Sequence, residues 1–173
     1  MDSASLDFEE YFRGRAPALL RTAYLLTGDR HLAEDLVQDA FARTHRAWRR
    51  LRDSSHADAY IRRAMYHLQV SVWRRRRVAE VLPGELPERY AGGGADHAGA
   101  AVQRLALRQA LLALPVRQRS AVVLRFLEDR SEAETAEIMN CSVGTLKSHT
   151  SRGLARLRQV LPEVANMSWE EAR

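Results

Sequence analysis

The sequence predicts an all-α protein built from two small helical domains that a flexible linker joins. In both halves of the 173-residue chain, apolar residues recur every three or four positions, which is the spacing of one face of an α-helix. Neither half shows the alternation of apolar and polar residues that predicts a β-strand. Between the halves, VLPGELPERYAGGGADHAGA at 81–100 has the proline, glycine and polar composition of a flexible linker. We therefore expect domains at 1–78 and 101–162, a linker at 79–100 and a tail at 163–173.

Three helices are expected in the N-terminal domain. The first runs from about Phe8 to Leu26 and stops at Gly28, which tolerates the left-handed backbone of a helix end. Asp29 is the expected N-cap of the second helix. Its predicted buried stripe consists of Leu32, Leu36, Val37, Ala40, Phe41, Thr44, Trp48 and Leu51. That stripe leaves Asp35, Gln38 and Asp39 on the exposed side of the helix.

The third helix, expected from about Asp58, contains the segment YIRRAMYHLQVSVWRRRR with six arginines, three aromatic residues and no acidic residue. Tyr66 and Trp73 are seven positions apart and so share one helical face. Aromatic rings between cations suit single-stranded DNA, because a stacked base contributes about 1 to 3 kcal/mol while guanidinium groups follow the backbone. The alternative is that both aromatics are half-buried core residues and that the arginine run is a solvated helix end. The cations that flank the face of Tyr66 and Trp73 are Arg62, Arg63 and Arg74 to Arg77.

The C-terminal domain is predicted to contain helices at 101–114 and 117–127, followed by a helix-turn-helix at 131–158. Ser131 and Glu134 have capping-box spacing, and Asn140 suits the left-handed backbone of a sharp turn. Ala136 is expected at the crossing of the two helices, with Ile138, Met139, Val143 and Leu146 as the buried contacts between them. The outward surface of the second helix carries Ser142, Thr145, Lys147, Ser148, His149 and Arg152. Such a surface fits the major groove of DNA.

An ordinary helical hairpin is the alternative interpretation of this motif, and the charge pattern argues against it. From Ile138 to Pro162 the chain has no acidic residue and has four cationic ones, whereas a solvated face normally mixes both signs. The preceding helix is acidic, which predicts that the basic helix faces phosphate and the acidic one faces away.

Composition excludes several other classes of function. A net charge of +5 favours a polyanionic partner, and no apolar run approaches the ~20 residues that span a bilayer. The acidic N-terminus is unlike a signal peptide, so we expect a cytoplasmic protein without membrane insertion. A carboxylate metal site at Asp35 and Asp39 lacks a His or Cys partner in the pattern, so no metal or cofactor is expected. The lone Cys141 is expected to be a small packed residue, and no nucleophile motif indicates an enzyme.

Three motifs in order give this chain a resemblance to a known family. They are LTGDRHLAEDLVQDAFAR (26–43), AYIRRAMYHLQVSVWRRRR (59–77) and the long stretch from LRQALLALPVRQRS to SRGLARLR (107–158). The chain resembles the extracytoplasmic-function group of bacterial RNA polymerase sigma factors, and is similar to its actinobacterial SigE-like branch. The resemblance implies a sigma-2 domain, a linker and a sigma-4 domain.

The resemblance also implies partners for each surface. Asp35, Gln38 and Asp39 would bind the clamp helices of the polymerase β′ subunit, and the sigma-4 domain would meet the β flap. The last helix would read the −35 element. The third helix would recognise and melt the −10 promoter element, with these candidate contacts: Arg62, Arg63, Tyr66, His67, Trp73 and Arg74. An anti-sigma factor is a further partner that the family often uses. Relatives often carry Asn, Gly and Arg where this chain has His67, Asn140 and His149.

Two other functions stay open at this point. A one-component regulator would use the helix-turn-helix alone and would not need Asp35 or Asp39. A nucleic-acid enzyme would need a ligand or nucleophile pattern, and the six scattered histidines provide no ligand spacing.

Overall fold

The computed structural model describes residues 3–51, 54–80 and 98–161, and all of the regular structure in these ranges is helical. The predicted all-α class is therefore confirmed. In chain order the elements are α1 (Ser3–Thr27), α2 (Arg30–Ala47), η1 (Trp48–Arg50), α3 (Ser54–Glu80), α4 (Ala98–Leu112), α5 (Val116–Val122), η2 (Val123–Leu127), α6 (Glu132–Ile138) and α7 (Val143–Val160). Most of the predicted linker and all of the predicted tail lie outside the described residues. Helix α4 already begins within the range predicted as linker.

Helices α1, α2 and α3 form an up-and-down bundle, and the junction between α1 and α2 follows the predicted chemistry. Gly28 has a φ of 73°, and its N–H bonds to the Tyr24 carbonyl at 2.8 Å. The Asp29 carboxylate then accepts a hydrogen bond from the Leu32 N–H at 2.9 Å, so Asp29 is the N-cap of α2.

The core of this bundle contains the predicted stripe of α2, with Leu36, Ala40 and Thr44 all buried. Leu32, Trp48 and Leu51 are only partly buried, because they lie at the two ends of the stripe. Thr44 places a hydroxyl in an apolar environment and donates it to the Ala40 carbonyl at 2.8 Å, so no polar atom is left without a partner there.

The second half folds around α5 and α7. The helix predicted at 117–127 is α5 continued by η2, a single π-helical turn that ends at Leu127. Asp129, two residues further on, has a φ of 49°. Helix α7 crosses α5 closely at Gly153, where a Cβ atom would lie 2.9 Å from Val122 Cγ2 and 3.3 Å from the Gln118 carbonyl oxygen. A side chain at this position would push the two helices apart.

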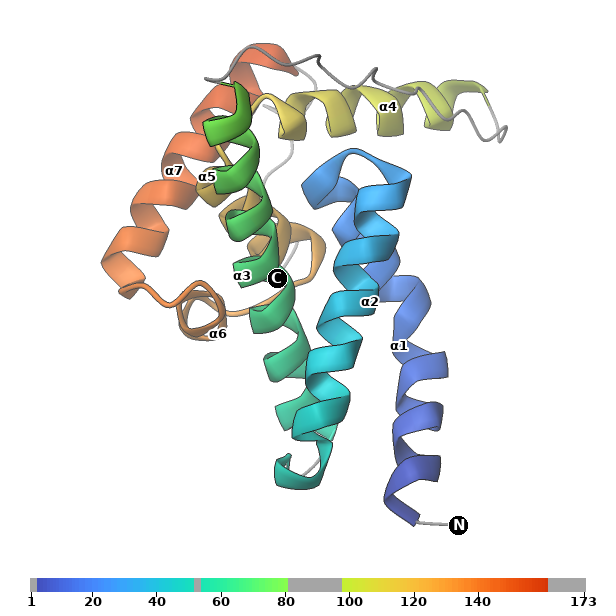
Figure 1. Ribbon diagram of the computed structural model, residues 1–173. Helices are drawn as coiled ribbons and strands as arrows, with labels where there is room; N and C mark the ends of the chain where they lie inside the picture. The colour runs from blue at the N-terminus through green and yellow to red at the C-terminus, as the bar shows by residue number, and fades with distance from the viewer. Residues whose placement is uncertain (1–2, 52–53, 81–97, 162–173) are drawn as a thin grey trace.

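The two halves pack against each other, with α3 between α2 on one side and the group α5, α6 and α7 on the other (Figure 1). Tyr66 of α3 shares a cluster with Ala121, Leu124 and Met139 of the C-terminal half. Leu26 at the end of α1 belongs to a second shared cluster, with Leu111 and Val122 among others. No helix in the described ranges has the length and apolar character needed to cross a membrane.

We predict that Gly28→Ala destabilises the protein by about 1 to 2 kcal/mol, because an L-residue is strained at this positive φ. The new Cβ would also lie 2.4 Å from Leu112 Cδ1 of α4. Urea denaturation monitored by circular dichroism measures the change. Gly14→Ala is the matched control, because a Cβ at this position in α1 has no neighbour within 4 Å. In a helix that substitution is expected to stabilise by about 0.5 to 1 kcal/mol. Equal stability of the two variants would contradict the strain at Gly28.

Candidate nucleic-acid and polymerase-binding surfaces

Helices α6 and α7 form the predicted helix-turn-helix, and its local determinants have the expected geometry. The capping box is complete, because Ser131 Oγ accepts from the Glu134 N–H at 3.2 Å and Glu134 Oε2 accepts from the Ser131 N–H at 2.8 Å. The hydrogen bonds from Ser131 lower the pKa of the Glu134 carboxyl. Asn140 has a φ of 50° in the turn, so an asparagine serves where a glycine is common. Ser142 caps α7 by accepting from the Thr145 N–H at 3.1 Å.

The outward face of α7 holds most of the residues predicted to contact DNA. Ser142, Thr145, Lys147, Ser148 and Arg152 are exposed. His149 is half-buried, and burial first, then Arg117 and Arg152, lower the pKa of its imidazole. This imidazole is therefore neutral at pH 7 and carries no charge for a phosphate contact. Val143 was predicted to be buried, but it is 40% exposed because it occupies the first turn of α7 before the contact with α6 begins.

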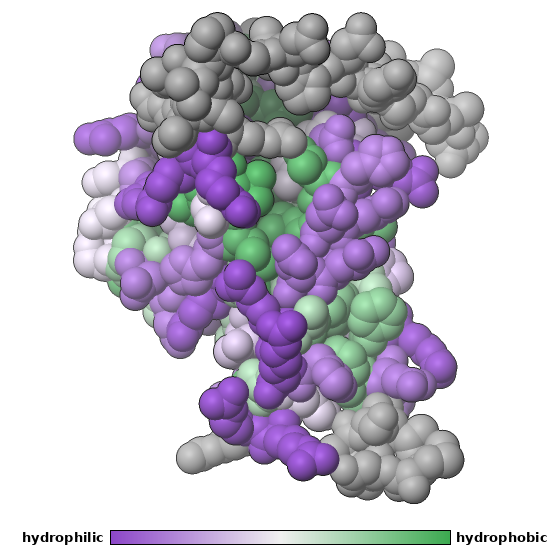
Figure 2. All heavy atoms as spheres, viewed as in Figure 1, coloured by the Kyte–Doolittle hydropathy of each residue, from purple (hydrophilic) through white to green (hydrophobic). Residues whose placement is uncertain are grey.

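A second surface lies on α2, where Asp35, Gln38 and Asp39 are exposed as the periodicity predicted. Asp35 and Asp39 border a cleft of about 300 Å³ between α2, α3 and α5. Leu36, Leu68 and Trp73 are among the apolar side chains that line it. In the view of Figure 2, a hydrophobic patch between the upper parts of α2 and α3 is bordered by hydrophilic side chains. The acidic side chains thus stand beside an open apolar surface.

The third surface, on α3, is divided between exposed and covered residues. Arg63, His67, Trp73 and Arg74 are exposed, and burial is the main cause of a lowered pKa at His67. Arg62 and Tyr66 are buried against the C-terminal half. The burial of Arg62 was not expected from the sequence, whereas that of Tyr66 agrees with the alternative of a core aromatic residue. The face that carries Tyr66 points toward α5 and α6 in this arrangement, so DNA has no access to it while the two halves are packed.

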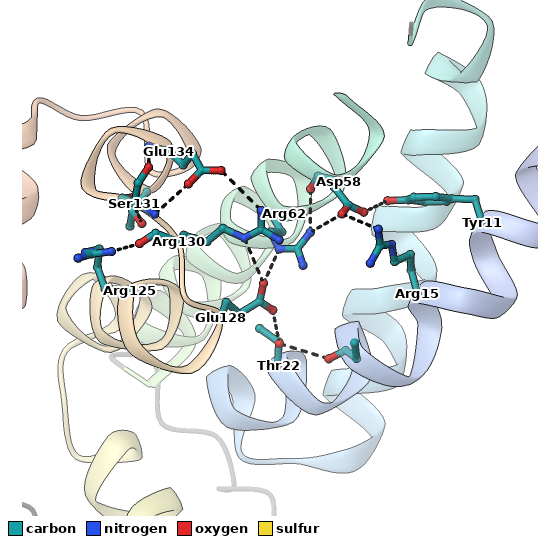
Figure 3. Close-up of polar contacts among 12 residues, drawn as sticks. Tyr11, Arg15, Thr22, Asp58, Arg62, Arg125, Glu128, Arg130, Ser131 and Glu134 are labelled. Atoms are coloured by element: carbon teal, nitrogen blue, oxygen red, sulfur yellow. Dashed lines mark hydrogen bonds and ion pairs between the residues drawn. The ribbon is translucent and has the colours of Figure 1, made fainter. Parts of the chain in front are cut away.

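A polar network surrounds Arg62 (Figure 3). Its Nε donates to Glu128 Oε2, and Nη1 donates to the Asp58 carbonyl at 3.2 Å. Thr22 of α1 donates its hydroxyl to the other oxygen of Glu128. Asp58 is paired with Arg15 at 3.1 Å and accepts a hydrogen bond from Tyr11 at 2.9 Å. Burial and this hydrogen bond raise the pKa of the Tyr11 phenol.

Two further polar ties between the halves were missed by the sequence interpretation. Gln69 donates to the Leu26 carbonyl at 3.0 Å and lies 3.2 Å from the Ser120 hydroxyl of α5. Arg119 donates to the carbonyl of Leu26, and also to those of Leu112 and Leu114, both at 3.1 Å. In the sequence, these contacts were indicated only by a polar residue, Gln69 or Arg119, on the apolar side of a helix. Such a residue does not show which distant group it will bond to.

Comparison with known proteins now identifies the two halves. The model of sigma-70 region 2 matches residues 11–78, and the model of sigma-70 region 4 matches residues 104–157. The RNA polymerase sigma-E factor of Streptomyces coelicolor is 44% identical over 157 residues, which cover 90% of this chain and 86% of that protein. The ECF RNA polymerase sigma factor SigM of Mycobacterium tuberculosis is 30% identical over 154 residues, with 89% and 76% covered.

A solved structure has the same arrangement of helices. The sigma factor RpoE of Bartonella quintana, crystallised with the anti-sigma factor NepR, superposes with a TM-score of 0.76 and 29% identity. The superposition covers 90% of this chain and 97% of that one. The chain contains sigma-70 region 2, with the acidic surface on α2, followed by sigma-70 region 4, with the basic helix-turn-helix. It therefore belongs to the extracytoplasmic-function group of the RNA polymerase sigma factor family.

Proposed function

We propose that this sigma factor binds core RNA polymerase through the exposed face of α2 and contacts promoter DNA through α3 and α7. The observation that carries the proposal is the separation of charge on one chain. Asp35 and Asp39 form an acidic face on α2, whereas α7 has no acidic residue and several exposed cations. The sigma factor performs no covalent chemistry itself and acts in the cytoplasm with the polymerase.

The α7 surface is suited to duplex DNA, and in the family arrangement this is the −35 element. A recognition helix places the side chains of its N-terminal half against base edges, where Thr145, Lys147 and Ser148 stand exposed. Arg152 lies about one turn beyond Ser148 and is suited to a phosphate contact. The neutral His149 reduces the charge that this helix presents, so Lys147 and Arg152 have a larger share of the electrostatic contact.

The α3 surface is suited to the single strand at the −10 element. Trp73 is 41% exposed, and the neighbouring Arg74 and Arg75 are also exposed. An accessible indole beside guanidinium groups can stack a base and hold its phosphate. Arg63 and His67 extend this surface along α3, whereas Arg62 and Tyr66 join it only when the two halves separate.

The α2 surface combines charge with apolar area, which is common in protein interfaces. The exposed face of α2 holds Asp35 and, one turn later, Gln38 and Asp39. These side chains point away from the bundle core. They would bind the clamp helices of the β′ subunit, while the C-terminal half would meet the β flap. Since a solved relative was crystallised with an anti-sigma factor, we also propose that such a protein binds this chain.

A one-component regulator is a weaker candidate, because it would use α6 and α7 and leave the whole region 2 half without a function. In vitro transcription with purified core polymerase and genomic fragments tests the proposed function directly. Start sites that depend on this protein are expected, and their upstream sequences would reveal the promoter elements. The absence of any start site that depends on the protein would contradict the proposal.

Replacing Lys147 and Arg152 together with Ala is predicted to weaken promoter binding by about 10- to 100-fold, because a charge-assisted contact contributes about 1 to 3 kcal/mol. Run-off transcription and filter binding of the holoenzyme measure the effect. Arg21→Ala is the control, since it removes an exposed cation from α1. Unchanged transcription with the Lys147 and Arg152 variant would contradict the assignment of α7 as the helix that contacts the promoter.

Charge reversal of Asp35 and Asp39 to Lys is predicted to abolish most co-purification with core polymerase, because opposed charges become like charges across the interface. The far-UV circular dichroism spectrum is expected to stay unchanged, since both side chains are exposed. The matched control reverses Glu9 and Glu10, which are exposed on α1. Full retention of polymerase by the α2 variant would disprove this interface.

Trp73→Ala is predicted to impair strand opening more than closed-complex formation, because stacking becomes available only after the strands separate. Permanganate reactivity of thymines near the start site reports opening, and a footprint at low temperature reports the closed complex. Tyr60→Ala, a second exposed aromatic residue of α3, is the control. Equal reactivity with the wild-type protein and the Trp73 variant would exclude base stacking by this indole.

A further inference from the structure

We propose that Arg117, His149 and Arg152 form a site for a backbone phosphate of promoter DNA where α5 crosses α7, and that His149 takes up a proton when the phosphate binds. The site extends the DNA-binding surface of α7 onto α5 and makes the contact depend on pH. This inference rests on the proposed function, because the ligand is a phosphate of the same duplex. Its chemistry is that of a phosphodiester held by two guanidinium groups and an imidazolium.

The place of the site follows from the close approach of α5 and α7, which lie side by side (Figure 1). At Gly153 an added Cβ would lie only 3.3 Å from the Gln118 carbonyl oxygen. Arg152 directly precedes Gly153 in α7, and Arg117 directly precedes Gln118 in α5. His149 lies about one turn before Gly153. The three side chains therefore stand around a single helix crossing.

The two arginines of this crossing are available to an anion. Arg117 and Arg152 are both exposed, and within the described ranges neither guanidinium has an ion pair or a hydrogen bond. Lys147, by contrast, lies 3.3 Å from Glu132. Guanidinium groups match the geometry of phosphate oxygens and bind them with charge-assisted hydrogen bonds. A phosphate between the two arginines would neutralise a local excess of positive charge.

His149 is half-buried beside these cations and is neutral in the free protein. Burial is the main cause of the lowered pKa of its imidazole, followed by Arg117 of α5 and then by Arg152 of α7. Both charged groups that act on the ring are thus positive. A bound phosphate reverses this balance, because its negative charge offsets the two guanidinium charges and favours an imidazolium. The pKa of His149 is therefore higher in the complex than in the free protein.

The same crossing provides a partner for each nitrogen of the charged ring. His149 Nδ1 is buried and has no hydrogen-bond partner among the described residues, which leaves Nε2 as the nitrogen that can reach a ligand. Gln118 Oε1 is also a buried atom without a partner in that part of the chain. An imidazolium donates from both nitrogens. In the complex, Nδ1–H donates to Gln118 Oε1 and Nε2–H donates to a phosphate oxygen.

The pH dependence of binding has a definite sign. Because the complex holds the proton more tightly, it binds more protons than the separate protein and DNA at any pH between the two pKa values of His149. Promoter affinity therefore increases as the pH falls through this window, by at most about tenfold per pH unit for one proton. The increase ends below the pKa of the free protein, where the imidazole is already charged before binding.

The test compares holoenzymes that contain wild-type protein, His149→Gln, which stays neutral, or His149→Arg, which stays charged. The probe is a fluorescein-labelled duplex with an upstream promoter region recovered by in vitro transcription, and fluorescence anisotropy measures its affinity between about pH 6 and about pH 8. The ratio of the wild-type affinity to that of His149→Gln is expected to be about three- to tenfold larger at the acidic end. The ratio of the two variants to each other is expected to stay constant.

Arg117→Gln tests the α5 side of the site. Loss of one phosphate contact is expected to weaken binding about three- to tenfold and to reduce the slope of log affinity against log salt by about 1. The matched control is Arg104→Gln, which removes an exposed cation from α4. Circular dichroism checks that each variant is folded.

The outcomes separate this inference from the proposed function. A ratio of wild-type to His149→Gln affinity that does not change with pH would overturn the proton uptake, and equal affinities of Arg117→Gln and Arg104→Gln would overturn the phosphate site. With specific start sites from the wild-type holoenzyme, both results leave the sigma factor function intact. The absence of such start sites would overturn the function and this inference together. If His149→Gln is unfolded, His149→Arg decides, since a constant ratio of wild-type to His149→Arg affinity also contradicts proton uptake.

Discussion

Helix α3 packs against both halves of the protein, and the rest of the architecture depends on that constraint. Ile61, Met65 and Leu68 point into the core shared with α1 and α2, whereas Tyr66 and Val70 point toward α5 and α6. A helix buried on two sides keeps only narrow strips for solvent. The strip with Arg63 and His67, and the end with Trp73 and Arg74, are the parts of α3 that remain available.

The interface between the halves is held by polar groups as much as by apolar ones. Arg62 with Glu128, Gln69 with Ser120, and Arg119 with the Leu26 carbonyl all cross it. Burial lowers the pKa of Arg119 to about 10, which leaves its guanidinium charged at neutral pH. Interfaces of this kind, between domains of one chain, resemble transient complexes and permit relative motion of the domains. This property suits the proposed placement of the two halves on separate promoter elements.

Charge has two uses in this molecule. Acidic residues on α2 are exposed and suit a protein partner, whereas acidic residues on α6 and at Glu128 pair with cations of the chain itself. These internal ion pairs partly neutralise basic side chains that are proposed to contact nucleic acid.

The sequence by itself determined the local structure and the exposed surfaces. Gly28, Asp29, Ser131 and Ser142 act within a few residues of their own position, so each helix boundary that they mark could be predicted. Helical periodicity likewise identified the exposed face of α2. Tertiary structure alone decided the pairing of Arg62 with Glu128, 66 positions apart, and the burial of Tyr66. The reason is that periodicity shows which face of a helix is apolar, but it carries no information on which distant helix covers that face.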